Sequence, residues 1–119
     1  MRVRISTTSA SLFYLDREKL LKELHKFSQE LVESSPFVKE VYLFGSLLRG
    51  DYRGLSDVDL IAVVSEDLSG KNFWRVYKEL FNFFADKLSI AFDLIVTDTE
   101  GKEQVLERLK PTLLLAKSQ

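Results

Sequence analysis

A continuous apolar run, Leu-Ile-Ala-Val-Val, occupies residues Leu60 to Val64. A strand that is apolar on both sides has to be covered on both faces, which is typical of an interior strand of a sheet. The run directly follows Asp57-Val58-Asp59. We therefore predict a buried central strand over Asp57 to Val64, with other elements packed on both of its faces.

The segment that begins near Asp16, a residue type that often caps helices, has the pattern of an amphipathic helix. Apolar residues recur there at spacings of four, three and four, which places them on one helical stripe: Leu20, Leu24, Phe27 and Leu31. The pair Ser35-Pro36 ends this helix, because a residue before proline is disfavoured in the α conformation.

The remaining chain alternates strands and helices without a repeat or linker. We predict strands over Val38–Phe44 and Phe92–Val96, a helical turn over Leu47–Arg49, and helices over Asn72–Lys87 and about Thr99–Leu109. This order predicts an α/β or α+β fold with helices on a small sheet. The 119 residues fit one domain, 1–119.

Two segments are open to more than one interpretation. Residues 1–14 are rich in Ser and Thr and are interpreted as an arm or an edge strand. Leu113-Leu114-Leu115, after Pro111, is a last core strand or helix, or a tail that docks on a partner.

Composition excludes several classes of site. The chain has no Cys and one His, so thiolate and multi-histidine metal sites are absent. Carboxylates remain, and they favour hard ions such as Mg²⁺. A net charge of −1 gives no general attraction for nucleic acid. Without an apolar run of roughly 18 residues or a signal peptide, a cytoplasmic protein is expected.

Asp57 and Asp59 stand at positions i and i+2 of the predicted strand, so both side chains point to one face. Two carboxylates placed in this way can converge on divalent ions. The pair alone is a weak signal, because a chain with eight Asp contains an Asp-x-Asp by chance about half the time.

Gly45-Ser46 strengthens the signal, because it leaves a strand and opens a helix ten residues before Asp57. Free backbone N–H groups at a helix start bind phosphate, glycine permits close approach, and the Ser hydroxyl adds a donor. Arg49, one turn later, can reach the same anion with its guanidinium fork. The alternative is an ordinary strand-to-helix turn.

Asp93 interrupts the apolar strand Phe92-Asp93-Leu94-Ile95-Val96. A buried carboxylate without a partner is costly, so Asp93 either meets a metal or is a solvated residue at the strand start. At a metal site it would suit the base that acts on an attacking hydroxyl.

Gly45-Ser46, ten residues and then Asp57-Val58-Asp59 resembles the signature of the polymerase-β-type nucleotidyltransferase superfamily, most closely its minimal nucleotidyltransferase (MNT) members. Phe44, Leu60, Arg49-Gly50 and Ser56 extend the likeness. The resemblance implies a nucleotidyltransferase core, a small mixed sheet backed by helices. Ser46 would bind the NTP phosphates, and Asp57, Asp59 and Asp93 would hold two catalytic Mg²⁺ ions.

The resemblance also implies a reaction: transfer of a nucleoside monophosphate, AMP from ATP being expected, to a hydroxyl acceptor. Because no acceptor-binding domain is visible, a partner is expected to supply the acceptor. MNT proteins of this size resemble antitoxins that modify a tyrosine of a HEPN-type toxin. The alternative is an inactive MNT-fold module that neutralises a partner by occlusion. A homo-oligomer is also compatible with the sequence.

The helix predicted over Asn72–Lys87 has an unusually wide apolar face. Trp74 and Phe83 lie off the stripe formed by the other apolar residues: Phe73, Tyr77, Leu80, Phe81, Phe84 and Leu88. Such a face is either one helix set deeply in its own core, or core plus a partner surface. His25, on the polar side of the first helix, is not expected to act in catalysis.

Overall fold

The computed structural model describes residues 17–49 and 58–119. Three expectations lie outside these residues: the arm or edge strand at 1–14, the Asp16 cap, and Asp57. Along the described chain the elements follow in this order: α2 (Arg17–Ser34), β1 (Val38–Phe44), α3 (Ser46–Arg49), β2 (Val58–Val64), α4 (Lys71–Lys87), β3 (Phe92–Asp98), α5 (Lys102–Leu109) and β4 (Thr112–Lys117).

The four strands form one mixed sheet in the order β3-β2-β1-β4. β1 runs antiparallel to both β2 and β4, whereas β2 and β3 are parallel. β2 is therefore an interior strand, and all five residues from Leu60 to Val64 are at most 1% exposed. The predicted central strand and the α/β fold class are both confirmed.

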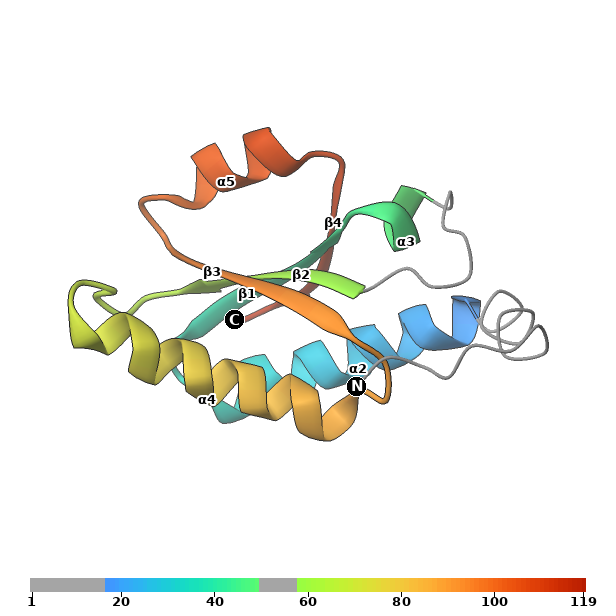
Figure 1. Ribbon diagram of the computed structural model, residues 1–119, viewed down its shortest axis with the longest axis horizontal. Coiled ribbons are helices and arrows are strands. Elements are labelled where there is room, and N and C mark those ends of the chain that lie inside the picture. Colours follow the sequence, from blue (N-terminus) through green and yellow to red (C-terminus); the bar gives the residue numbers. More distant parts are fainter. Residues whose placement is uncertain (1–16, 50–57) are drawn as a thin grey trace.

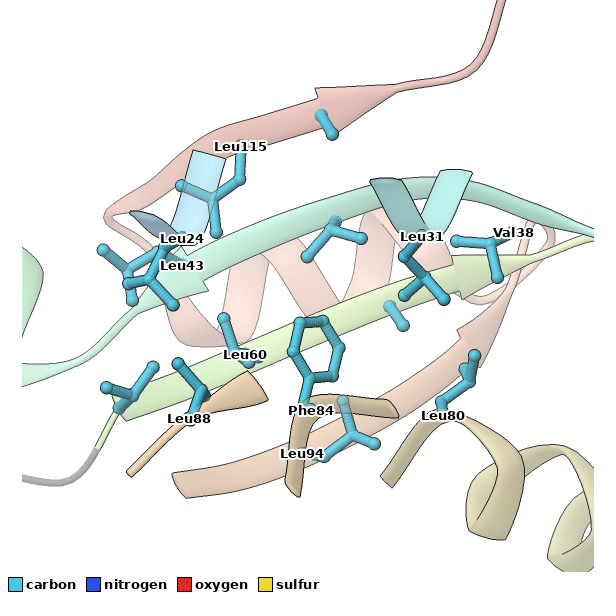
Figure 2. Packing of buried hydrophobic residues seen from close by; sticks show 14 of the residues in the cluster. Leu24, Leu31, Val38, Leu43, Leu60, Leu80, Phe84, Leu88, Leu94 and Leu115 are labelled. Carbon is cyan, nitrogen blue, oxygen red and sulfur yellow. The ribbon is translucent and has the colours of Figure 1, made fainter. Parts of the chain in front are cut away.

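Helices α2 and α4 cover one face of the sheet, and α5 lies on the other side (Figure 1). Figure 2 shows how Leu24 and Leu31 of α2 and Leu80 and Phe84 of α4 pack against strand residues such as Leu60. Burying apolar surface in this way contributes about 25 cal/mol per Å². On β2, Val58, Leu60, Ala62 and Val64 join this core. Because strand side chains alternate, Asp59 points to the opposite face.

Two C-terminal elements differ from their predicted bounds or were left open. α5 begins at Lys102 rather than near Thr99, because Asp98 Oδ1 accepts a hydrogen bond from the Gly101 N–H at 2.7 Å and the chain turns there. Leu113-Leu114-Leu115 lies within an edge strand, β4, paired to β1. Within the described ranges, each helix is too short or too polar to span a bilayer.

Candidate active site

Gly45 joins β1 to α3 with a backbone conformation that favours glycine. Its φ is +87°, in the left-handed region that residues with a Cβ rarely adopt. A Cβ at this position would overlap Oδ2 of Asp59 and lie 3.0 Å from its Cγ. The Gly45 carbonyl accepts a hydrogen bond from the Arg49 N–H at 3.1 Å, which closes the turn of α3. Glycine therefore permits the start of α3 to lie against the Asp59 carboxylate.

Asp59 and Asp93 are direct neighbours across the parallel pair β2–β3. Adjacent strands lie about 4.8 Å apart, so the two side chains stand side by side on one face of the sheet. On its other side, Asp59 pairs with Phe44, the residue before the glycine turn. Asp59 is half-buried and Asp93 is exposed. The register thus brings together two carboxylates that are 34 residues apart in the sequence.

The other predicted site residues occupy the following places. Ser46 is the first residue of α3, and Arg49 is its last and is exposed. Asp57, immediately before β2 in the sequence, lies outside the described residues, so its predicted role remains a prediction. Asp93 occupies the second position of β3, next to the strand start.

The donor set of this site suits a hard divalent cation. Its side-chain donors are carboxylate oxygens, which Mg²⁺ prefers. Among residues 17–49 and 58–119, His, Cys, Asp and Glu side chains nowhere gather in threes that could hold a metal. The pair Asp59 and Asp93 would therefore need a third ligand from outside the described ranges, such as Asp57, or from substrate phosphate.

Arg17 makes a contact with the site turn that the sequence analysis did not predict. Its Nε donates to the Leu47 carbonyl and its Nη2 to the Leu48 carbonyl, both at 3.0 Å. These carbonyls belong to α3, 30 and 31 residues further along the chain. No sequence signal could have revealed this contact, because only the packing of α2 brings Arg17 to α3.

A second network lies on β1 and links the sheet to α5. Glu40 is buried, with 8% of the residue exposed. It accepts a hydrogen bond from the Tyr42 hydroxyl at 2.7 Å and forms an ion pair with Lys102 Nζ at 2.7 Å. Because Tyr42 pairs with Ile61 and Phe44 with Asp59, this network lies on the same sheet face as Asp59, further along β1.

The pKa of Glu40 is lowered and that of Lys102 is raised, as expected for a carboxylate and an ammonium that stabilise each other's charge. Burial raises the pKa of Glu40, but hydrogen bonds from Lys102 and Tyr42 and the nearby positive charges outweigh it and lower the pKa below 4.5. The hydrogen bond to Glu40 raises the pKa of Lys102. Burial and the bond to Glu40 raise the pKa of the Tyr42 phenol. The Tyr42 hydroxyl is thus protonated and donates to Glu40.

A family model for the nucleotidyltransferase domain matches residues 21–112, which include the glycine turn and all three aspartates. The chain belongs to the nucleotidyltransferase family. The family and the enzyme class predicted from Gly45-Ser46 and the aspartates are thereby confirmed. This nucleotidyltransferase is also similar to a solved Sulfolobus solfataricus protein of proposed nucleotidyltransferase function, with 31% identity and a TM-score of 0.61. The match covers 92% of this chain and 87% of that one.

Two further solved structures are less similar to this nucleotidyltransferase. One, of proposed nucleotidyltransferase function, is 21% identical with a TM-score of 0.42, covering 85% of this chain and 99% of that one. The other is a mutant of the toxin–antitoxin pair MntA–HpeT, 21% identical with a TM-score of 0.46, covering 87% and 74%. A search of curated proteins gave no match.

Proposed function

We propose that this nucleotidyltransferase is a Mg²⁺-dependent enzyme that transfers AMP from ATP to a hydroxyl group. The observation that carries the proposal is the register of Asp59 with Asp93 beside the Gly45 turn. Carboxylates suited to a divalent cation and a helix start suited to phosphate adjoin at one end of β2.

In this proposal, some residues of the chain bind the phosphates and another accepts the proton. The backbone N–H groups at the start of α3 and the Ser46 hydroxyl bind the triphosphate, and Arg49 adds its guanidinium. Asp57, Asp59 and Asp93 would hold Mg²⁺, which when bound neutralises phosphate charge during the displacement. The acceptor oxygen forms a bond to the α-phosphorus, the bond to the bridging oxygen breaks, and pyrophosphate leaves. Asp93, the more exposed carboxylate, takes the acceptor's proton.

The test is transfer of label from α-³²P-ATP in the presence of Mg²⁺, with and without the protein encoded by the adjacent gene. We expect label on the acceptor with wild type and with Asp86→Asn, a matched control on the exposed side of α4. Asp59→Asn should abolish transfer and leave the fold intact. If Asp59→Asn and wild type both neutralise the partner and neither transfers label, the protein acts by occlusion and the enzyme proposal is wrong.

We also infer that the acceptor hydroxyl belongs to a separate protein, such as the tyrosine of a HEPN-type toxin. The support is an aromatic surface on α4, defined by Phe73, Trp74, Tyr77 and Phe81. Their rings contact one another in series at centroid distances of 5.4 to 6.0 Å. Trp74 is 62% and Phe81 37% exposed, whereas Val76, Leu80 and Phe84 form the buried side of the helix. Large exposed aromatics of this kind are enriched at protein interfaces.

This aromatic surface reaches the edge strand β3, on the face of the sheet opposite the Asp59 and Asp93 carboxylates. The Phe81 ring lies 4.8 Å from that of Phe92, which directly precedes Asp93 on the edge strand β3. A protein bound along α4 would thus lie beside the strand that carries Asp93. Trp74→Arg should abolish transfer to the partner while ATP affinity stays within about twofold, since side chains this exposed rarely affect folding. Asn82→Arg, also exposed on α4, is the control. Unchanged transfer by Trp74→Arg would refute this docking surface.

A further inference from the structure

Arg17 acts on α3 at the end opposite the phosphate-binding turn. The last four carbonyls of any helix have no partner inside that helix, and α3 has only four residues. Arg17 supplies two donors to this end, from Nε to Leu47 and from Nη2 to Leu48, each at 3.0 Å. A guanidinium presents these donors in a fixed planar fork, and its positive charge is favourable at a helix C-terminus.

The orientation of α3 depends on contacts of this kind. Isolated helices shorter than about 12–15 residues are marginal in water, so a four-residue helix takes its direction from the residues it touches. Among the described residues, three contacts contribute to it. Gly45 lies against Asp59 at the start, Leu47 is fully buried in the core, and Arg17 binds the carbonyls at the end.

We propose that Arg17 is a positioning residue for the phosphate-binding turn. By fixing the end of α3 it sets the direction of the helix, and with it the position of Ser46 relative to Asp59. This inference rests on the proposed function, in which Ser46 and the start of α3 bind the triphosphate. Arg17 precedes residues 21–112, the part of the chain that the family model matches. We assign Arg17 no contact with the substrate; it acts only through α3.

The first measurement concerns α3 alone and needs no nucleotide. The Arg49 amide, bonded to the Gly45 carbonyl at 3.1 Å, reports whether the turn is closed. Hydrogen exchange by NMR should be on the order of tenfold faster at this amide in Arg17→Ala, as expected for the loss of about one net hydrogen bond. Amides of β2 and of the middle of α2 should be unchanged. Lys22→Ala, exposed on the same helix, is the matched control.

The second measurement tests whether the contact of Arg17 with α3 affects the affinity for ATP. The Kd of Mg·ATP should rise on the order of tenfold in Arg17→Ala, with KM raised in parallel and kcat within about twofold, because a ground-state contact is weakened. Arg17→Lys keeps the charge without the fork and should lie between wild type and Arg17→Ala. In a Ser46→Ala background, Arg17→Ala should weaken ATP binding less than it does in wild type, because part of its effect passes through the Ser46 hydroxyl.

The outcomes separate the two proposals. Unchanged exchange of the Arg49 amide in Arg17→Ala, or additive effects of the Arg17 and Ser46 changes on ATP affinity, would overturn the positioning role. If wild type binds no Mg·ATP, the proposed function fails, and the Arg49 amide alone then decides whether Arg17 holds α3. If Arg17→Ala does not fold, Arg17→Lys is judged by the same two measurements.

Discussion

Replacing Gly45 with Ala should damage the site more than the fold. At φ +87°, any residue with a Cβ is strained by about 1–2 kcal/mol. The new methyl group would also overlap the Asp59 carboxylate, whose Cγ would lie only 3.0 Å from it. Asp59 stands on β2, a strand buried on both sides, so its backbone cannot retreat. We therefore expect its carboxylate to turn away from the position that it shares with Asp93.

Gly70 provides a control for a Cβ at a positive φ that meets no neighbouring atom. It also has a positive φ, +59°, but a Cβ built there meets no atom within 4 Å. Gly70→Ala should therefore show the backbone strain, together with a small change at the start of α4, which it caps. Overpacking adds about 1–3 kcal/mol. Gly45→Ala should thus cost about 2–5 kcal/mol.

Urea unfolding followed by far-UV circular dichroism gives both stabilities, and Mg·ATP binding of the folded variants gives the functional effect. We expect Gly45→Ala to unfold at lower urea than wild type and to bind Mg·ATP at least tenfold more weakly, the equivalent of about 1.4 kcal/mol. Gly70→Ala should bind Mg·ATP like wild type. Equal stabilities and equal ATP affinities of the two variants would show that Gly45 does not serve the contact with Asp59.

Three further predictions concern the Ser46 hydroxyl, the proposed base Asp93 and the ion pair of Glu40 with Lys102. Ser46→Ala should raise the Kd of Mg·ATP by about tenfold, measured calorimetrically, for the loss of one hydrogen bond to a charged group. Asp93→Asn should slow single-turnover transfer by about 10²–10⁴ while the Kd changes far less, since a base acts only in the transition state. Lys102→Met leaves the Glu40 carboxylate buried without its cation and should cost about 2 kcal/mol at pH 7 in urea unfolding, whereas Lys110→Met, an exposed ion pair, should change stability by less than about 0.5 kcal/mol. Because the folded-state pKa of Glu40 is lowered, the stabilisation of the fold by its ionised carboxylate is present above about pH 4.5 and is lost as pH falls through the folded pKa. If Lys102→Met is as stable as wild type at pH 7, the ion pair does not stabilise the fold.

The main elements of this fold could be predicted from sequence because their signals are local. The apolar run at Leu60–Val64 and the stripe of α2 both follow from the periodicity of side chains, and both are present as expected. The ends of elements depend on less local contacts. α5 begins late because Asp98 binds the Gly101 amide, and β4 forms because β1 offers it a free edge. Neither pairing leaves a periodic trace in the sequence.

The sequence singled out the residue types of the candidate site, and the resemblance implied that Asp59 and Asp93 share it, which agrees with the register of their strands. Gly45, Ser46 and Asp59 stood out because their spacing carries a family pattern; the family match confirms the family, and the roles of these residues stay predictions. That Asp93 pairs with Asp59 depends on the register of two strands separated by α4, which the sequence does not encode locally. Arg17 and the Glu40–Lys102 pair were missed for the same reason, since each joins residues at least 30 positions apart.

The two halves of the site differ in how they are held, and this difference bears on which distant changes can affect the enzyme. Asp59 belongs to a strand with hydrogen-bonded neighbours on both sides, so its position follows from the sheet itself. Ser46 belongs to a four-residue helix whose contacts in the described chain include those of Gly45, Leu47 and Arg17. A rigid core transmits strain, whereas a short helix with few contacts can change its direction at small cost. Substitutions remote from the site should therefore alter nucleotide affinity through α3 more readily than they alter the placement of the carboxylates.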